Sequence, residues 1–372
     1  MSNTFVTPTL VARDAALLLA ANAVAPWLID RQHETKFNAQ KAGQTIKATY
    51  MSAQSASEFS STTSAANSVE NEVSLTLSKH YYVRHTLTTA ERTYQLDDFT
   101  QKVTLPAVRA LLDAADNYII DVMTAGFARN LVGTDGSSPT TIANILTGRK
   151  KLQDNLAPLD QRVGILDTTA EAALLALTQF QSQDYGPEAL QGLRDAVLAK
   201  RFGVDWFVDQ NCGALDVGDT AGTVVIKTTV ALGLATIIVD GLTEATGTIY
   251  KGTRFLIAGH TSVYTLTADA TIASNEATLV FTPVLEAEGT AEDAITWKAG
   301  AAQDLIYHKP AVIGAVIPPA ALLVNSAIGV YNNLGVRVSM DSSLSTLADD
   351  IVYDILVGCT VMRHEGGTVF QA

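Results

Sequence analysis

The segment from Val73 to Leu87 alternates between apolar and polar positions. Its apolar or aromatic positions are Val73, Leu75, Leu77, Tyr81, Val83 and Leu87. A period of two is typical of a β-strand with one buried face. At roughly 3.3 Å per residue such a strand would be about 50 Å long, well beyond the usual length.

A helical pattern follows, from Leu105 to Leu131. Thr104 is an acceptable N-cap, and Pro106 suits the first turn. Apolar or small residues recur at steps of three and four, at Leu105, Val108, Leu112, Ala115, Ile119, Val122 and Gly126. Such a helix would be on the order of 40 Å long. Because two elements of this length are difficult to bury in one compact domain, we expect neighbouring subunits to cover them.

Before the alternating segment, Thr45 to Met51 is typical of a strand. Residues 52–68 are almost entirely Ser, Ala and Thr, with one charge, Glu58, and one aromatic residue, Phe59. Such a composition cannot bury enough apolar area to become ordered. Between two strands, it predicts the mobile tip of a long two-stranded ribbon. A disordered linker between domains is the alternative.

Near the N-terminus, an amphipathic helix is predicted from Thr9 to about Ala25, ending near Pro26. The uninterrupted apolar run from Ala15 to Ile29 is shorter than the roughly 20 residues that a membrane-spanning helix needs. No basic segment precedes it. We therefore expect neither a signal peptide nor a membrane span.

Residues 140–215 indicate a mixed α/β region. The expected elements are a buried strand at Arg162–Leu166, a helix opening with a capping box from Thr168 to Glu171, a short helix near Leu190–Leu198, and a strand at Val204–Val208. After residue 298, the sequence resumes with LIYHKPAVIGAVIPP at 305–319. A strand at Val336–Met340 and a long β-prone run from about Ile351 to Met362 follow.

Residues 217–298 contain short β-rich runs separated by turns rich in Gly, Asp, Asn and Thr. The runs are Val224–Lys227, Thr236–Val239, Arg254–Ala258, Val263–Leu266, Thr278–Thr282 and Ile295–Trp297. This spacing predicts a small antiparallel barrel or sandwich. Since it lies between two α/β regions, we expect an inserted domain.

Composition limits the classes of function. The chain has 372 residues, 47% of them hydrophobic and 17% charged, so it is globular. A net charge of −13 argues against a sequence-reading or generally basic nucleic-acid binder, although it does not exclude enclosing DNA. The two cysteines, Cys212 and Cys359, lack metal-site spacing and predict buried, reduced thiols in a cytosolic protein.

Catalytic motifs are absent from the sequence, and Gly247 to Gly252 lacks the lysine of a phosphate-binding loop. His80 and His85 should lie on opposite faces of their strand because their spacing is odd. Three carboxylates, Asp349, Asp350 and Asp354, suggest a solvated edge or an inter-subunit salt bridge. We predict no catalytic, cofactor-binding or metal-binding residues, no cofactor and no enzymatic activity.

Several segments, in order, resemble the major capsid proteins of tailed double-stranded-DNA bacteriophages, most closely the short-tailed P-twenty-two type with an inserted β-domain. These segments are RVGILDTTAEAALLAL at 162–177, LRDAVLAKRFGVDWFVDQN at 193–211, YKGTRFLIAG at 250–259, ATLVFTPV at 277–284, LIYHKPAVIGAVIPP at 305–319 and YDILVGCTVMRHEGGTVF at 353–370. In the last one, His364 stands where proline is common in the family.

The resemblance implies an α+β, Hong Kong ninety-seven-type capsid fold with an inserted small β-barrel domain. The expected parts are an N-terminal arm (1–35), an extended loop or β-ribbon (36–98), the spine helix of a peripheral domain (99–139), an axial domain in two parts (140–216 and 299–334), the inserted β-domain (217–298) and peripheral C-terminal strands (335–372).

It also implies a function: self-assembly, through hexamers and pentamers, into the icosahedral head shell that encloses the phage genome. The expected partners are further copies of the chain, a scaffolding protein, a portal, possibly a decoration protein, and packaged DNA bound without sequence recognition. The expected location is the virion capsid, assembled in the bacterial cytoplasm. An encapsulin-like nanocompartment shell enclosing an enzyme cargo is the alternative.

Overall fold

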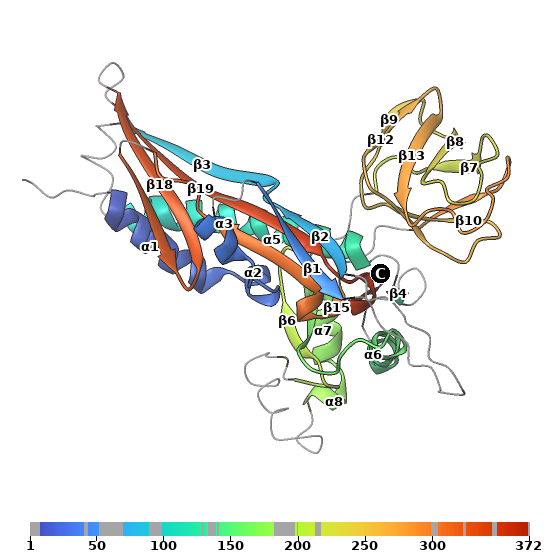
Figure 1. Cartoon of the computed structure of the whole chain (residues 1–372), viewed down its shortest axis with the longest axis horizontal. Coiled ribbons are helices and arrows are strands. Elements are labelled where there is room, and N and C mark those ends of the chain that lie inside the picture. The colour runs from blue at the N-terminus through green and yellow to red at the C-terminus, as the bar shows by residue number, and fades with distance from the viewer. Residues whose placement is uncertain are drawn as a thin grey trace, which may run out of the picture. The chain divides into compact units, whose positions relative to one another are not determined.

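The structure is a computed structural model (Figure 1). Its chain divides into two compact units. The first contains residues 1–116 and 313–362, and the second contains residues 117–312 and 363–372. The described residues are 8–40, 44–51, 70–88, 99–127, 130–132, 139, 141–181, 198, 200–212, 217–298, 304–322, 325–343 and 348–370. Residues 52–68, the predicted ribbon tip, therefore lie outside them.

A five-stranded sheet dominates the first unit. Its strands are β3 (Lys79–Thr88), β16 (Val312–Ile317), β17 (Ser326–Tyr331), β18 (Leu334–Ser343) and β19 (Ala348–Val361). The long strand β19 pairs antiparallel with β3 along one side and with β18 along the other, and β17 follows β18. The predicted strands at 336–340 and about 351–362 are thus confirmed; β18 is longer at both ends, and β19 begins three residues earlier and ends one residue earlier than expected.

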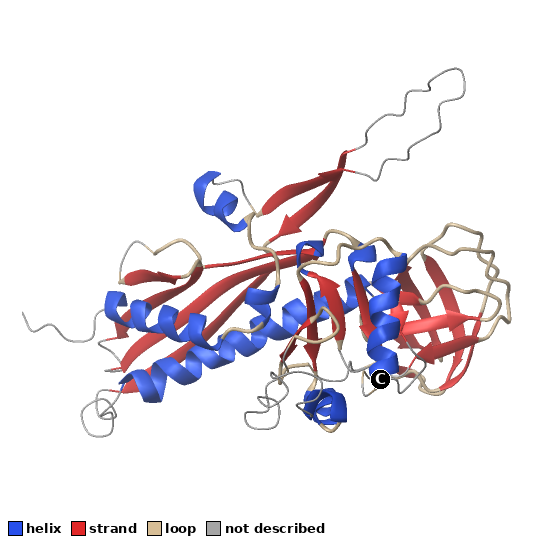
Figure 2. Cartoon of the chain, turned by 90° about the horizontal axis from the view of Figure 1, so that it is seen from below, coloured by secondary structure: helices blue, strands red, loops and turns tan. Residues whose placement is uncertain are grey.

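Helices cover one face of this sheet (Figure 2). Helix α1 (Pro8–Asn22) packs against β17 and β18 through its small, buried positions, which include Ala12. The approach is so close that a Cβ atom at Gly329 of β17 would lie 1.9 Å from the carbonyl oxygen of Ala12. The first half of α5 (Leu105–Phe127) lies on the same side as α1.

The predicted single strand from Val73 to Leu87 is wrong in its continuity. It is two strands, β2 (Glu70–Thr76) and β3, which belong to different sheets. Strand β2 pairs with β1 (Thr45–Met51), whereas β3 pairs with β19. Alternation persists on both sides of the break because, in each strand, one face is more buried than the other. The pattern therefore does not reveal that the pairing partner changes.

The spine helix also differs from its prediction at both ends. A π-helical turn, η1 (Thr100–Thr104), leads directly into α5, so Thr104 is not an N-cap. Its hydroxyl is instead buried 3.0 Å from the hydroxyl of Tyr353. The helix ends at Phe127 rather than Leu131, which belongs to β4 (Leu131–Val132). The predicted apolar stripe is otherwise mostly buried.

Toward the N-terminus, the predicted helix ends near its expected position, at Asn22. Pro26 does not simply stop it but lies in the first turn of a new short helix, α2 (Ala25–Leu28). A third helix, α3 (Glu34–Gln40), leads toward β1. Among the described residues, no helix is long and apolar enough to cross a membrane.

The second unit contains a five-stranded sheet in the order β4, β20, β15, β5 and β6. The bounds of its strands and of the nearby helices are β5 (Arg162–Leu166), β6 (Asp205–Val208), β15 (Leu305–His308), β20 (Gly367–Phe370), α6 (Ile142–Asp154), α7 (Thr168–Leu175), α8 (Thr178–Gln181), η3 (Lys309–Ala311) and η4 (His364–Gly366). The predicted strand β5 is confirmed, and β6 begins one residue later than expected. Of the predicted helix at 190–198, only Leu198 is described.

One boundary in this region corrects the sequence analysis. The N-cap of α7 is Asp167, not Thr168, because the Asp167 carboxylate accepts a hydrogen bond from the Ala170 amide at 2.6 Å. A carboxylate at the start of a helix is also favoured by the helix dipole.

Residues 222–298 form an eight-stranded sheet. Its strands are β7 (Gly222–Ile226), β8 (Thr236–Leu242), β9 (Thr246–Ile249), β10 (Arg254–Ile257), β11 (Tyr264–Leu266), β12 (Ala270–Ala273), β13 (Glu276–Thr282) and β14 (Ile295–Lys298). The six predicted runs are all strands. The two that were missed, β9 and β12, contain Gly or Ala, which have low β propensity. Inward side chains of the eight strands form one hydrophobic cluster.

Candidate assembly surface

The predicted ribbon exists as β1 and β2, which pair antiparallel from Thr45 opposite Thr76 to Met51 opposite Glu70. One of its faces carries Ile46 and Ala48 opposite Leu75 and Val73. The other face is polar, with Lys47 forming an ion pair with Glu72. The ribbon is therefore amphipathic, and its apolar face must be covered to be stable.

The covering is confined to the base of the ribbon, which we call the ribbon root. There Ile46, Ala48, Leu75 and Leu77 are buried in one cluster with Phe37 of α3 and with β16. The side chains that β16 contributes are Ile313, Ala315 and Ile317. Farther along the same face of the ribbon, Val73 and Tyr50 are only partly buried. Figure 2 shows the ribbon projecting away from the sheet of the same unit.

Gly358 sets the contact between the ribbon root and the sheet. A Cβ atom at this position of β19 would lie 2.4 Å from the carbonyl oxygen of Thr76 at the end of β2. No real Cβ atom comes so close to backbone, so only glycine allows β2 to cross β19 here. The direction in which the ribbon leaves the sheet depends on this crossing.

A buried ion pair holds the segment that precedes the ribbon against β16. The Glu34 carboxylate pairs with Arg31 at 2.6 Å and accepts a hydrogen bond from the Val316 amide at 2.9 Å. Burial raises the pKa of Glu34, while the charge of Arg31 acts to lower it. Arg31 also lies over the Trp27 ring, 5.3 Å from its centroid. These contacts fix the N-terminal segment beside the ribbon root.

The face of the main sheet opposite the helices carries ion pairs. Asp354 is buried, accepts a hydrogen bond from Nε of Arg337 at 2.9 Å, and lies 2.9 Å from Nε2 of His80. Asp350 lies in the same row of β19 and pairs with Arg84 and Thr86 of β3. We call this surface, centred on these two aspartates, the open face.

The open face corrects the expectation for the three carboxylates. Asp354 is not at a solvated edge, and its cation partner lies in the same chain. Asp350 likewise pairs within the chain, and Asp349 accepts a hydrogen bond from the Ser342 hydroxyl on the other side of the sheet. Arg84 and Arg337 escaped notice because they lie on other strands, and sequence separation hides cross-strand neighbours.

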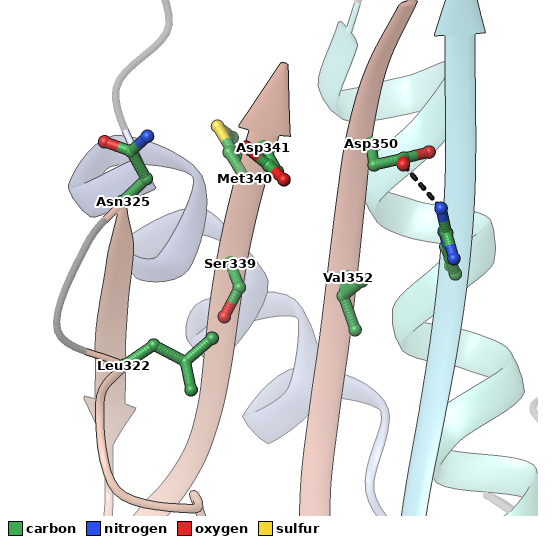
Figure 3. A pocket seen from close by; sticks show the side chains of 8 residues that line it. Leu322, Asn325, Ser339, Met340, Asp341, Asp350 and Val352 are labelled. Carbon is green, nitrogen blue, oxygen red and sulfur yellow. Dashed lines mark hydrogen bonds and ion pairs between the residues drawn. The ribbon is translucent and has the colours of Figure 1, made fainter. Parts of the chain in front are cut away.

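The open face is hollowed over β18 and β19, between β3 and the segment that precedes β17 (Figure 3). The hollow has a volume of about 430 Å³. Its lining residues are Arg84, Leu322, Asn325, Ser339, Met340, Asp341, Asp350 and Val352. The dashed line at Asp350 in Figure 3 marks its ion pair with Arg84. We call this feature the acidic hollow, since it holds two aspartates and one arginine.

The remaining candidate residues are placed as follows. His80 and His85 alternate along β3 and so lie on opposite faces, as predicted. Cys212 and Cys359 are buried and form no disulfide, and burial raises the pKa of Cys359 to about 12. Within the described ranges, no group of three or more His, Cys, Asp or Glu side chains could hold a metal ion.

Comparison with solved structures places this architecture. A chain from Mycobacterium phage Che8 has a TM-score of 0.55 to this chain at 13% sequence identity, and the match covers 94% of this chain and 91% of that chain. This chain shares that fold. The expectation of an α+β phage capsid fold is therefore supported at the level of the fold, while the inserted barrel and the P-twenty-two likeness remain predictions.

Two capsid structures show weaker likenesses. The capsid of the cyanophage P-SCSP1u has a TM-score of 0.47 at 11% sequence identity, and the match covers 88% of this chain and 83% of that chain. The mature capsid of bacteriophage PhiM1 has a TM-score of 0.49 at 10% sequence identity, and the match covers 89% of this chain and 83% of that chain. No protein-family model matches the sequence, and no curated protein matches it.

Proposed function

We propose that this chain is the major capsid protein of a tailed bacteriophage and assembles with copies of itself into an icosahedral head shell. The main support for this proposal is the ribbon, because its apolar face is buried at the ribbon root but only partly buried farther along. A two-stranded ribbon is marginal by itself in water and gains stability when another surface covers it. In a shell, the neighbouring copy supplies that surface.

The fold shared with a phage chain supports this function over the nanocompartment alternative. The division into an arm at 1–35, a ribbon at 36–98, a spine at 99–139, an axial domain at 140–216 and 299–334, an inserted domain at 217–298 and closing strands at 335–372 stays a prediction for the proposed shell. Within the part expected at 36–98, β1 and β2 form the ribbon, whereas β3 belongs to the main sheet. Scaffolding, portal and decoration proteins and the packaged DNA are its proposed partners.

Assembly of this kind works with weak contacts. Each subunit touches several neighbours at once, so contacts of a few kcal/mol each multiply on closure. Weak individual contacts also allow misplaced subunits to leave before the shell closes. Pairing or covering of ribbon edges by neighbours would protect backbone groups that otherwise promote aggregation.

The test is electron microscopy of the purified chain, expressed alone and with its phage's scaffolding protein. We expect closed particles of uniform diameter, and no particles from a variant that lacks residues 52–68 although its subunits remain folded. A wild-type chain that stays monomeric at high concentration under both conditions would refute the proposal. Nucleic acid rather than an enzyme inside native particles would separate the phage capsid from the nanocompartment.

A further inference from the structure

The acidic hollow has two chemically different walls. Its apolar wall consists of Leu322, Met340 and Val352. Its polar wall includes Asp341 of β18 and Asp350 of β19, which lie directly opposite each other in the antiparallel register. Like charges in directly opposed positions destabilise a sheet unless a cation balances them. The hollow thus combines an apolar channel with an anionic end.

Arg84, the cation that lines the hollow, is already matched. Its Nη2 atom lies 2.5 Å from the Asp350 carboxylate, which also accepts a hydrogen bond from the Thr86 hydroxyl at 2.5 Å. These bonds lower the pKa of Asp350 and keep it ionised. Asp341 accepts a hydrogen bond from the Ser342 amide at 2.9 Å, and in the described part of the chain it forms no ion pair. The hollow therefore keeps one unbalanced negative charge.

We propose that the acidic hollow binds the side chain of an arginine or lysine from a second copy of this chain. The alkyl part of such a side chain would lie along Leu322 and Val352, and its charged end would reach Asp341. The Ser339 hydroxyl, which is buried without a partner among the described residues, adds an acceptor. This inference rests on the proposed function, because self-assembly brings the second copy.

The chain itself offers suitable cations, which favours a second copy as the occupant. Arg13, Lys36 and Arg109 are exposed, and none of them forms an ion pair within the described residues. Exposed unpaired cations on one copy and an unbalanced carboxylate in a hollow on another are complementary in charge. Such complementarity contributes register and specificity to an interface.

The experiment compares Asp341→Asn and Asp341→Lys with wild type in particle assembly. Because the described bond of Asp341 is local, both variants should keep the fold, which circular dichroism and thermal melting would verify. We expect Asp341→Asn to raise the concentration needed for half-maximal assembly about tenfold, the loss of one charged contact, and Asp341→Lys to raise it further. Glu288→Gln, which removes an exposed negative charge from the 222–298 sheet region, is the matched control and should assemble like wild type.

Leu322→Ser tests the apolar wall and should also weaken assembly, since it shortens the channel for the alkyl chain. If Asp341→Asn and Asp341→Lys assemble at the wild-type concentration, the hollow is not an inter-subunit site, and the proposed capsid function stands without it. If wild type itself forms no particles under any condition, the proposed function fails and this inference fails with it. Those two results are distinct.

Discussion

The ribbon and the sheet of residues 222–298 are both antiparallel β-structure, but they differ in how much of their apolar surface is buried within the chain. The eight-stranded sheet buries Phe255, Tyr264, Leu279 and Phe281 completely or nearly so within its own cluster. The ribbon buries its apolar face only at the root. One region completes its core within the chain, whereas the other leaves surface to be covered.

This difference has an energetic basis. Burial contributes about 25 cal/mol per Å² of apolar surface, and two strands cannot enclose a core of their own. Eight strands with alternating inward side chains can. The number of strands therefore decides whether an antiparallel sheet buries its own core or leaves apolar surface for another subunit to cover.

The largest effect is expected from Phe255→Ala. Phe255 is fully buried, with ring centroids 5.6 Å from Tyr264, 5.4 Å from Phe281 and 5.6 Å from Trp297. Removing a ring in such a position costs about 3 to 5 kcal/mol. If the region is self-sufficient, hydrogen exchange of the full chain should show lost protection in 222–298 and unchanged protection in β18 and β19.

Tyr250→Ala is the matched control, because this aromatic side chain in the same region is 43% exposed. It should change the free energy of unfolding by less than about 0.5 kcal/mol, as for most surface substitutions. Equal loss of protection in β18 and β19 upon Phe255→Ala would break the comparison, since the two regions would then unfold as one.

The sequence predicted the bounds of a strand well where the apolar pattern arose from pairing within a single sheet. Strand β1 at Thr45–Met51 and strand β5 at Arg162–Leu166 have the predicted bounds, because each is a short apolar or alternating run that stays in one sheet. The break between Thr76 and Lys79 was missed, since alternation continues while the pairing partner changes. Local pattern reports burial and does not identify the partner.

The candidate surface was harder to predict than the fold. The ion pair of Asp354 with Arg337 joins strands that are consecutive in the chain, whereas that of Asp350 with Arg84 joins residues 266 positions apart. Only the sheet register places these groups together. Gly358 also gave no sequence signal, because its role depends on where Thr76 crosses β19.

A smaller effect on stability is expected from Gly358→Ala, which sharpens the comparison at the ribbon root. The new methyl group would meet the Thr76 carbonyl oxygen, so β2 or β19 must shift. Overpacking of this kind costs about 1 to 3 kcal/mol. Because the shift also redirects the ribbon, particle assembly should fall more than thermal stability does. Microscopy and a thermal melt of the same preparation would measure the two effects.

Thr360→Ala serves as the control for this substitution, since it alters the same strand two residues away without adding an atom. It should leave assembly unchanged. Normal particles from Gly358→Ala would show that the crossing of β2 over β19 does not set the ribbon's direction, and the ribbon would then resemble the self-sufficient sheet more than we argue.

The smallest effect concerns Glu286, which tests whether the 222–298 region also holds its loops by itself. Its carboxylate accepts hydrogen bonds from the amide and hydroxyl groups of Thr261 and Ser262, which lower the pKa of Glu286 to about 2. Since the folded-state pKa lies below the unfolded value, the stabilisation is present above about pH 4.5 and is lost as the pH falls toward 2. Solvent screening at this exposed site limits the stabilisation to less than about 1 kcal/mol.

Thermal melts of wild type and Glu286→Gln should therefore differ at pH 7 and converge near pH 2, whereas Glu288→Gln should match wild type throughout. A difference between wild type and Glu286→Gln that persists unchanged at pH 2 would mean that the loop is held by packing rather than by the ionised carboxylate.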